Sequence, residues 1–233
     1  MINRDRVGKW AEETGIELTS EKLEALDRYA EEVAETNKLF NLTAITEPED
    51  MEILNIIDCL SIVPFIPEGA RVADVGTGAG FPGMVIRIMR DDVELTLIEA
   101  TNKKLDFVCR TAEKLGYKVE GTHMRSEEAA RSDLRGSFDV VTARAIAPLP
   151  VLLEYTLPLL KEGGVLLAMK GPAAEEEIAQ AANALSELRG KIKVVHDVEL
   201  PSGEKRSIIE VVQNGKCPDK YPRASGAIRK KPL

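Results

Sequence analysis

A short stretch of the chain, VADVGTGAGFPG, places a carboxylate directly before a run of glycines. Gly78, Gly80 and Gly83 form a literal G-x-G-x-x-G, a string that holds the pyrophosphate of a dinucleotide in many α/β proteins. Asp74 lies just upstream, where its charge opposes a phosphate, and no Lys or Arg lies between residues 71 and 87 to compensate. The GK[ST] of a P-loop is also missing. The stretch therefore predicts a ligand that approaches the glycine backbone closely and accepts a neighbouring carboxylate.

A second carboxylate, Glu99, ends the apolar run LTLIE. An acidic residue at the end of the next strand accepts hydrogen bonds from ribose hydroxyls, so we expect a nucleoside derivative. NAD and S-adenosylmethionine both contain a ribose, but S-adenosylmethionine carries a sulfonium and an ammonium in place of phosphates. Two carboxylates without a nearby cation favour S-adenosylmethionine, bound by Asp74, Glu99, Gly78 and Gly80. Asp74 can also cap the N–H groups of the loop, alone or in addition.

The elements that must position these residues begin at residue 71, where short apolar runs alternate with helical segments. We expect strands at 72–75, 95–98, 140–142 and 165–169, and helices at 83–90, 103–115, 149–160 and 173–189. This alternation predicts a parallel sheet with right-handed crossovers, and it puts the glycine loop at the carboxyl end of a strand. Residues 192–200 and 207–213 flank PSGEKR and predict a hairpin, so one late strand should run antiparallel.

The residues ahead of this region predict helices at 4–14, from 19 or 20 onward, and at 48–63. We interpret residues 1–66 as an N-terminal helical cap. Residues 67–233 then form the ligand-binding domain with a basic C-terminal tail, and the two parts are expected to pack as one compact unit.

Composition excludes several classes of protein. Hydrophobic residues make up 44% of the 233 residues and charged residues 30%, which is ordinary for a globular protein. Nothing resembles a signal peptide, and no apolar run is long enough to span a membrane. Three isolated cysteines without a C-x-x-C, and only two histidines, argue against a disulfide framework or a zinc site. We expect a cytoplasmic protein without a metal, and nothing requires more than a monomer.

Charge is unevenly distributed along the chain. The net charge is −8, yet residues 214–233 hold six Lys or Arg and one Asp, a net +5, which leaves −13 on the rest. A basic tail on an acidic body is either a solvated terminus or a local patch that binds phosphates. Both interpretations remain open at this point.

Six stretches of the sequence resemble one family, the bacterial 16S ribosomal RNA guanine-N7 methyltransferases, also called glucose-inhibited division protein B. In order, they are NLTAI at 41–45, DVGTGAGFPG at 74–83, RSEEAA at 125–130, FDVVTARAIAPL at 138–149, AMKGP at 168–172 and YPRASGAIRKKPL at 221–233. The last is more specific than the glycine loop, which many methyltransferases share. The resemblance implies a Rossmann-like class I methyltransferase fold: a mostly parallel seven-stranded sheet with one antiparallel strand and helices on both faces.

The resemblance also implies roles for individual residues. Gly76 and Phe81 would contact the cofactor, Ser126 and Glu127 would border its adenine, and Arg144 would lie between cofactor and substrate. Each has a simpler alternative. Phe81 can belong to the core, Glu127 to a solvated helix start, and Arg144 can pair with Asp74 or Glu99.

The chemistry implied is methyl transfer from S-adenosylmethionine to N7 of a guanine in 16S rRNA or the small ribosomal subunit. Because N7 carries a free lone pair, we expect no general base, and in-line positioning of the reactants would provide the catalysis. Arg144 and Lys170 would hold the guanine O6 or a phosphate, and Arg206 and Arg223 would continue a basic track. Three rivals remain open: a methyltransferase for a small molecule or protein, an NAD-dependent oxidoreductase, and a non-enzymatic RNA-binding factor.

The chain departs from the family pattern at two places. Thr36 and Asn37 replace a Trp-Asn pair before NLT. Leu54 and Asn55 replace a basic residue and a His, and Cys59 replaces a Ser. These changes put in doubt any role assigned to that Trp or that His.

Overall fold

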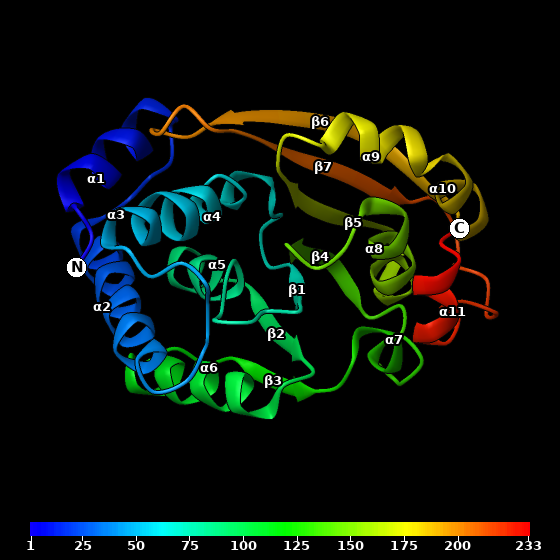
Figure 1. Cartoon of the computed structure of the whole chain (residues 1–233), viewed down its shortest axis with the longest axis horizontal. Coiled ribbons are helices and arrows are strands. Elements are labelled where there is room, and N and C mark those ends of the chain that lie inside the picture. Colours follow the sequence, from blue (N-terminus) through cyan, green and yellow to red (C-terminus); the bar gives the residue numbers. More distant parts are fainter.

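A seven-stranded sheet forms the centre of the computed structural model, which describes all residues from 1 to 233 (Figure 1). The strand order is β3-β2-β1-β4-β5-β7-β6. The strands are β1 Arg71–Val75, β2 Glu94–Glu99, β3 Glu120–His123, β4 Phe138–Arg144, β5 Leu160–Lys170, β6 Gly190–Glu199 and β7 Lys205–Gln213. The five strands from β3 to β5 pair in parallel, whereas β7 runs antiparallel to both β5 and β6. The predicted mostly parallel sheet with a late antiparallel strand is confirmed.

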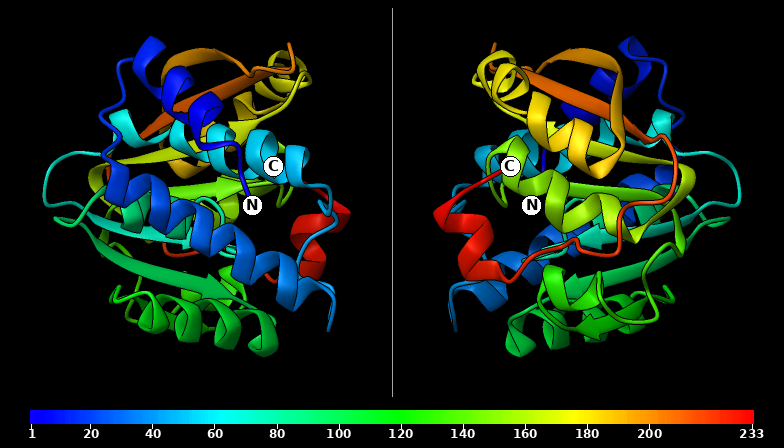
Figure 2. Two further views of the ribbon diagram at one scale, coloured as in Figure 1. Left: turned by 90° about the vertical axis from the view of Figure 1, so that its left-hand side faces the viewer. Right: turned by 90° about the vertical axis from the view of Figure 1, so that its right-hand side faces the viewer.

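Helices cover both faces of the sheet (Figures 1 and 2). One face carries α5 Gly83–Met89 and α6 Asn102–Lys114, with the N-terminal helices outside them. The other face carries α7 Ser126–Ala129, α8 Leu149–Thr156, η3 Leu157–Leu159, α9 Ala174–Gln180, α10 Ala182–Leu188 and α11 Ser225–Lys230. The helix expected at 173–189 is interrupted at Ala181, and neither α11 nor the largely exposed edge strand β3 was predicted from the sequence.

Alternation along the strands explains the two layers. Val72 packs in the hydrophobic cluster on the α5 side, whereas Ala73 and Val75 pack in the cluster on the α8 side. Since successive strand residues point to opposite faces, Asp74 must point toward α5. The carboxylate is therefore directed beneath the glycine loop by the strand pattern itself.

The N-terminal cap consists of α1 Arg4–Glu13, α2 Ser20–Asn37 and a third segment built from three pieces. Asn3 and Thr19 cap the first two helices through their side chains. The third segment is α3 Pro48–Asp50, the π-helix η1 Met51–Ile57 and α4 Asp58–Leu60, followed by the 3₁₀ turn η2 Val63–Phe65. The helix expected at 48–63 thus exists over most of its length, but its wide π-turns were not predicted.

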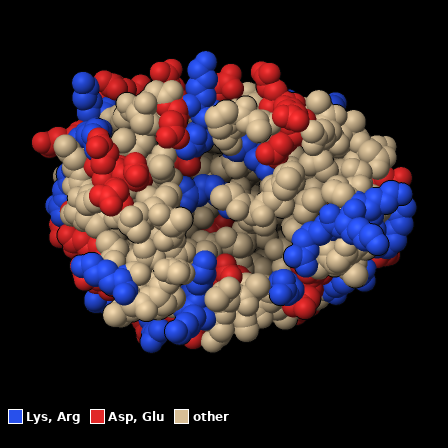
Figure 3. Space-filling model, in the orientation of Figure 1, with Lys and Arg blue, Asp and Glu red and all other residues tan.

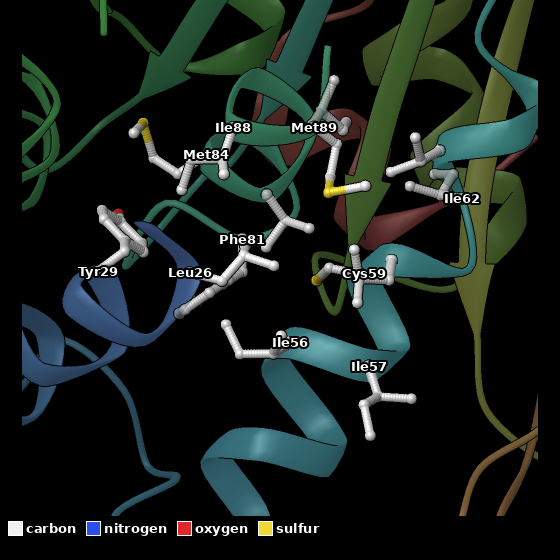
Figure 4. Packing of buried hydrophobic residues seen from close by; sticks show 14 of the residues in the cluster. Leu26, Tyr29, Ile56, Ile57, Cys59, Ile62, Phe81, Met84, Ile88 and Met89 are labelled. Carbon is white, nitrogen blue, oxygen red and sulfur yellow. The ribbon is translucent and has the colours of Figure 1, made fainter. Parts of the chain in front are cut away.

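The cap and the sheet share one hydrophobic core. Leu26 and Tyr29 of α2 and Ile56 of η1 point toward Phe81 and Met84, which belong to the glycine loop and α5 (Figure 4). The Tyr29 ring stands edge-on to the Phe81 ring, with centroids 5.6 Å apart. The Tyr29 hydroxyl donates a hydrogen bond to the Ala79 carbonyl oxygen over 2.7 Å. The glycine loop is therefore packed from the cap side.

No helix of the chain combines the length and apolarity that a membrane crossing requires.

Candidate functional site

A cleft of about 540 Å³ opens at the carboxyl ends of β1, β2 and β4. It lies where β2 and β4 flank β1 on opposite sides, the kind of position where open α/β sheets bind ligands. Gly76, Glu99, Ser126 and Glu127 all line it. Four residues predicted to bind the cofactor, from three separate stretches of sequence, are thus brought to one cleft of nucleoside size.

Packing within the protein explains part of the glycine loop. A Cβ atom on Gly80 would lie 1.9 Å from the Tyr29 hydroxyl oxygen, and one on Gly83 would lie 2.7 Å from Asp74 Oδ2. Two of the three glycines in the G-x-G-x-x-G string are therefore required by the cap and by Asp74. Gly76 is different, because it lines the cleft itself with a φ of 64°.

Asp74 is completely buried and does not line the cleft. Its Oδ2 accepts a hydrogen bond from the Gly83 N–H over 3.0 Å, and its Oδ1 accepts one from the Thr142 hydroxyl over 3.0 Å. Burial raises the pKa of Asp74 to about 6, although these hydrogen bonds oppose the shift. The capping role left open by the sequence is observed, and contact with a cofactor stays a prediction.

Glu99 presents its carboxylate to the cleft while bonding to the loop. Its Oε2 accepts a hydrogen bond from the Gly78 N–H over 3.0 Å, and its Oε1 accepts one from the Thr101 N–H over 2.7 Å. Each carboxylate oxygen can accept a further hydrogen bond. The arrangement therefore fits two ribose hydroxyls at the position predicted.

The adenine end of the predicted site is formed by α7. Ser126 and Glu127 are half-buried in its first turn, and the Arg125 N–H donates to the Glu128 carboxylate in a capping box. Glu127 therefore lies at the start of a helix and also lines the cleft, so the two interpretations of this residue are compatible. Phe81, in contrast, is buried among core residues and does not line the cleft, so its contact with a cofactor stays a prediction.

Arg144 ends β4 and is held by the cap. Its guanidinium donates hydrogen bonds to the Leu54 carbonyl oxygen, to Asn55 Oδ1 over 2.5 Å and to Asp58 Oδ2 over 3.4 Å. It also lies over the Phe81 ring, 5.7 Å from the centroid. The partners suggested from the sequence, Asp74 and Glu99, are not the ones it uses.

The site residues that sequence reasoning missed are therefore Asn55 and Asp58. Asn55 stood out only as a departure from the family pattern, and no spacing rule connects it to β4. Burial raises the pKa of Asp58, and the nearby Arg144 and Arg206 oppose that shift.

The other residues predicted to bind RNA are already paired. Lys170 donates to the Ala147 carbonyl oxygen and contacts the Glu177 carboxylate at 2.7 Å. Arg206 Nε lies 3.9 Å from Asp58 Oδ2, which places Arg206 beside Arg144. Arg223 lies elsewhere, on the α8 side, and its role in a basic track stays a prediction.

Arg223 ties the C-terminal tail to α8. Its Nε and Nη2 atoms contact the carboxylate of Glu154, which is fully buried, and its backbone N–H donates to the same group. Beyond it, Ile228 of α11 is buried against Val151 and Tyr155. The tail is therefore anchored at Arg223 and Ile228, whereas residues 229–232 are exposed to solvent.

The tail also forms part of the cleft wall, which no sequence pattern indicated. Ser225, Arg229 and Pro232 line the cleft. Arg229, Lys230 and Lys231 are exposed and form no ion pair. In Figure 3 the Lys and Arg atoms gather over α11, beside the hollow near the centre of this face.

Comparisons with known proteins agree with this geometry. A family model described as rRNA small subunit methyltransferase G matches residues 22–209. A protein named ribosomal RNA small subunit methyltransferase G from Desulfitobacterium hafniense (strain Y51) is 42% identical over 221 residues, 94% of this chain and 92% of the relative. A protein of the same name from Streptococcus pyogenes serotype M1 is 41% identical over 229 residues, 95% of this chain and 96% of the relative.

Solved structures show the same fold at low identity. TYW2 of M. jannaschii in complex with AdoMet has a TM-score of 0.56 at 14% identity, covering 67% of this chain and 74% of that one. An O-methyltransferase from Bacillus cereus in complex with SAH has a TM-score of 0.55 at 18% identity, covering 79% of this chain and 90% of that one. These likenesses establish the Rossmann-like methyltransferase fold predicted from the sequence.

Proposed function

This chain belongs to the rRNA small subunit methyltransferase G family, and we propose that it transfers a methyl group from S-adenosylmethionine to N7 of a guanine in 16S ribosomal RNA. The observation that carries this proposal is the position of Glu99 in the cleft beside Gly76 and Ser126. A carboxylate next to an open glycine backbone suits a cofactor that has a ribose and positive charge but no phosphate.

The cofactor side would use residues of the cleft. Glu99 would accept hydrogen bonds from the ribose hydroxyls, and Ser126 and Glu127 would border the adenine. Gly76 would allow the methionine portion to approach the backbone, and the buried charge of Asp74 lies beneath the loop. When bound, S-adenosylmethionine supplies an electrophilic methyl group on a sulfonium.

The acceptor side would use Arg144. Its Nη atoms donate three hydrogen bonds to the cap, while its Nε–H and the second N–H of Nη2 donate to no group of the protein and remain free for a ligand. Guanine presents O6 beside N7 on its major-groove edge, and a guanidinium is well suited to O6. Because the N7 lone pair is already free, the chain needs no general base. Its contribution would be to hold the base in line with the methyl group.

The RNA would cross the cleft between two cationic rims. One rim would be Arg229, which lines the cleft, with the exposed Lys230 and Lys231 next to it, where Lys and Arg atoms gather over α11 (Figure 3). The other would be Arg206, which lies beside Arg144. Contacts of this kind with phosphates give affinity that falls with salt. Lys170 and Arg223 complete the proposed track. Lys170, Arg223 and Arg206, which pairs with Glu204, are each already paired with a carboxylate, so we expect all three to contribute less to RNA affinity than the unpaired cations of the tail.

The oxidoreductase alternative loses its main support in this geometry. Gly80 and Gly83 make room for Tyr29 and Asp74, so the literal G-x-G-x-x-G does not indicate a pyrophosphate. Ribosomal RNA as a substrate also suits the cytoplasmic location expected from the scattered cysteines, and we retain the monomer as the expected state.

The test is methyl transfer from labelled S-adenosylmethionine to 16S rRNA and to small subunits that lack the modification. Strand cleavage specific for 7-methylguanosine then locates the label. A single cleavage site in one of the two substrates supports the proposal, and the preferred substrate shows whether the enzyme acts on naked RNA or on an assembled particle. Label at another atom would overturn the N7 assignment, and cofactor binding without transfer to either RNA would overturn the proposed substrate.

A further inference from the structure

The cap makes every polar contact of the Arg144 side chain. Its three partners are the Leu54 carbonyl oxygen, Asn55 Oδ1 and Asp58 Oδ2, which lie 90, 89 and 86 residues away in the sequence. All three belong to one segment, from η1 to α4. Since one guanidinium contacts all of them, they must face the same side of that segment.

Asn55 is the partner whose side chain makes only one other polar contact, with Met51. It is fully buried, and its Nδ2 is directed to the sulfur of Met51 at 3.2 Å, so its oxygen is turned toward Arg144. A buried amide is costly unless its oxygen is bonded, and Arg144 supplies that bond. The segment is a π-helix in which the Asp58 N–H donates to the Ile53 carbonyl oxygen, five residues back. Such wide turns are frequently found at functional sites.

The guanidinium held in this way does not itself line the cofactor cleft, but it lies next to the segment that carries the glycine loop. It lies over the ring of Phe81, which directly follows the glycine loop, and its side chain remains 17% exposed. The Nε–H has no partner in the protein and, together with the second N–H of Nη2, is left as a donor for a ligand. The orientation of these free donors depends on what holds the two Nη atoms.

We propose that Asn55 is a positioning residue for methyl transfer, which acts by fixing the Arg144 guanidinium at the acceptor side of the cleft. Asp58 supports the same guanidinium with a carboxylate and links it to Arg206. This inference rests on the proposed function, and it adds a contribution of the cap to catalysis. Because neither Asn55 nor Arg144 lines the cofactor cleft, we expect the pair to act on the acceptor and to leave cofactor affinity unchanged.

The kinetic test compares Asn55→Leu, which keeps the size and removes the oxygen, with Asn55→Asp, which keeps an oxygen acceptor. We expect Asn55→Leu to lower kcat about tenfold with the affinity for S-adenosylhomocysteine unchanged, and Asn55→Asp to keep kcat within about threefold. Ile56→Val is the structural control, because Ile56 is equally buried in the same segment and makes no polar contact with Arg144.

A double-mutant cycle separates positioning from packing. In an Arg144→Ala background, Asn55→Leu should cause almost no further loss of kcat, whereas Ile56→Val should have the same effect in both backgrounds. Equal loss from Asn55→Leu with and without Arg144 would overturn the proposal, because the effect would then arise from packing alone.

An experiment without turnover separates this inference from the proposed function. In ¹⁵N NMR of the arginine side chains, the Arg144 guanidinium, identified by its absence in Arg144→Ala, should rotate slowly in the wild type and in Asn55→Asp. It should rotate faster in Asn55→Leu. Unchanged rotation in Asn55→Leu would contradict the inference even if methyl transfer occurs, whereas slowed rotation in a wild type that transfers no methyl group would contradict only the function.

Discussion

The cofactor side of the cleft is assembled from segments that are close in sequence, whereas the acceptor side joins segments far apart. Gly78 and Glu99 are hydrogen-bonded across 21 residues, and Asp74 and Gly83 across nine. Arg144 and the Leu54 carbonyl oxygen are bonded across 90 residues. The polar contacts of the cofactor loop therefore lie mostly within one β-α-β unit, with Tyr29 of the cap packed against it, whereas every polar contact of Arg144, which we propose for the acceptor side, comes from the docked cap.

One element departs from this contrast. The tail helix α11 comes from the far end of the chain, yet it lines the cofactor cleft. It is fixed by Ile228 in a small hydrophobic cluster and by the ion pair between Arg223 and Glu154. The cofactor side thus has two parts. The local floor is formed by residues of the β-α-β unit, such as Gly76 and Glu99, and the distant wall is formed by tail residues such as Arg229. Variants can perturb the two parts separately.

The largest effect is expected from Arg223→Ala. Removing this side chain leaves the fully buried Glu154 carboxylate without its cation, so the free energy of unfolding should fall by about 3 kcal/mol. Urea denaturation measures the change. Lys230→Ala, an exposed cation of the same tail, is the matched control and should change stability by less than about 0.5 kcal/mol. Equal changes in the two variants would contradict an anchoring role for Arg223.

The local floor is tested by Glu99→Ala. Two hydrogen bonds from the ribose to a charged acceptor are worth about 3 kcal/mol together, so the affinity for S-adenosylhomocysteine should fall roughly 100-fold. Isothermal titration calorimetry measures this affinity. Glu94→Ala, an exposed Glu at the opposite end of the same strand, should have no effect. If Glu99→Ala binds as tightly as the wild type, the ribose assignment is wrong.

Asp74 predicts a pH dependence of cofactor binding. Its pKa is raised to about 6 by burial, so the carboxylate is ionised above this pH and neutral below it. A cationic cofactor favours the ionised form, and S-adenosylmethionine affinity should therefore fall about tenfold from pH 7 to pH 5. Calorimetry at several pH values checks this, and Asp74→Asn should remove the dependence.

The titration of Asp74 has the opposite effect on the stability of the free protein, whose free energy of unfolding should decrease as the pH rises. Because the folded-state pKa of Asp74 exceeds its unfolded value, its contribution to stability is present at pH below the unfolded value and is lost as the pH rises through 6. The difference in unfolding free energy between wild type and Asp74→Asn, measured from pH 4 to pH 7, should show this loss. A flat difference would mean that Asp74 does not titrate in this range.

The smallest effect concerns the distant wall. Arg229→Ala should weaken S-adenosylhomocysteine binding about threefold, because Arg229 lines the cleft, which corresponds to well under 1 kcal/mol. Lys230→Ala removes the same charge from the next residue, which is not part of the cleft wall, and should leave this affinity unchanged. Equal weakening in both would indicate only a general effect of charge.

Sequence patterns were most reliable where a contact is local. The glycine loop and the second carboxylate were predicted from consecutive residues, and Ser126 from the family resemblance of one short stretch. The structure brings Gly76, Glu99 and Ser126 to one cleft. The strand pattern also directed Asp74 beneath the loop. These outcomes follow from strand alternation and from the meeting of parallel strand ends at one edge of the sheet.

Patterns were least reliable for charged residues with distant partners. The sequence suggested Asp74 or Glu99 as the ion-pair partner of Arg144, whereas the side chains that it contacts are Asn55 and Asp58. Arg223 was predicted to bind RNA because the tail is basic, but its guanidinium forms an ion pair with Glu154 on α8. A long cationic side chain can reach several carboxylates, and the packing of helices decides which one is near.

The sequence by itself determined the alternation of strands and helices after residue 71, apart from β3 and α11, as well as the cofactor loop and the family to which the chain belongs. Each of these follows from residues that are a few positions apart. Only the tertiary structure decided that Asn55 contacts Arg144 and that α11 lines the cleft. Both contacts depend on how the cap and the tail dock on the sheet, and docking is set by the shared hydrophobic surfaces around Tyr29 and Ile228. The hydrophobic effect is non-directional and does not specify which apolar surface packs against which. The spacing of residues in the sequence therefore does not predict how the cap and the tail dock.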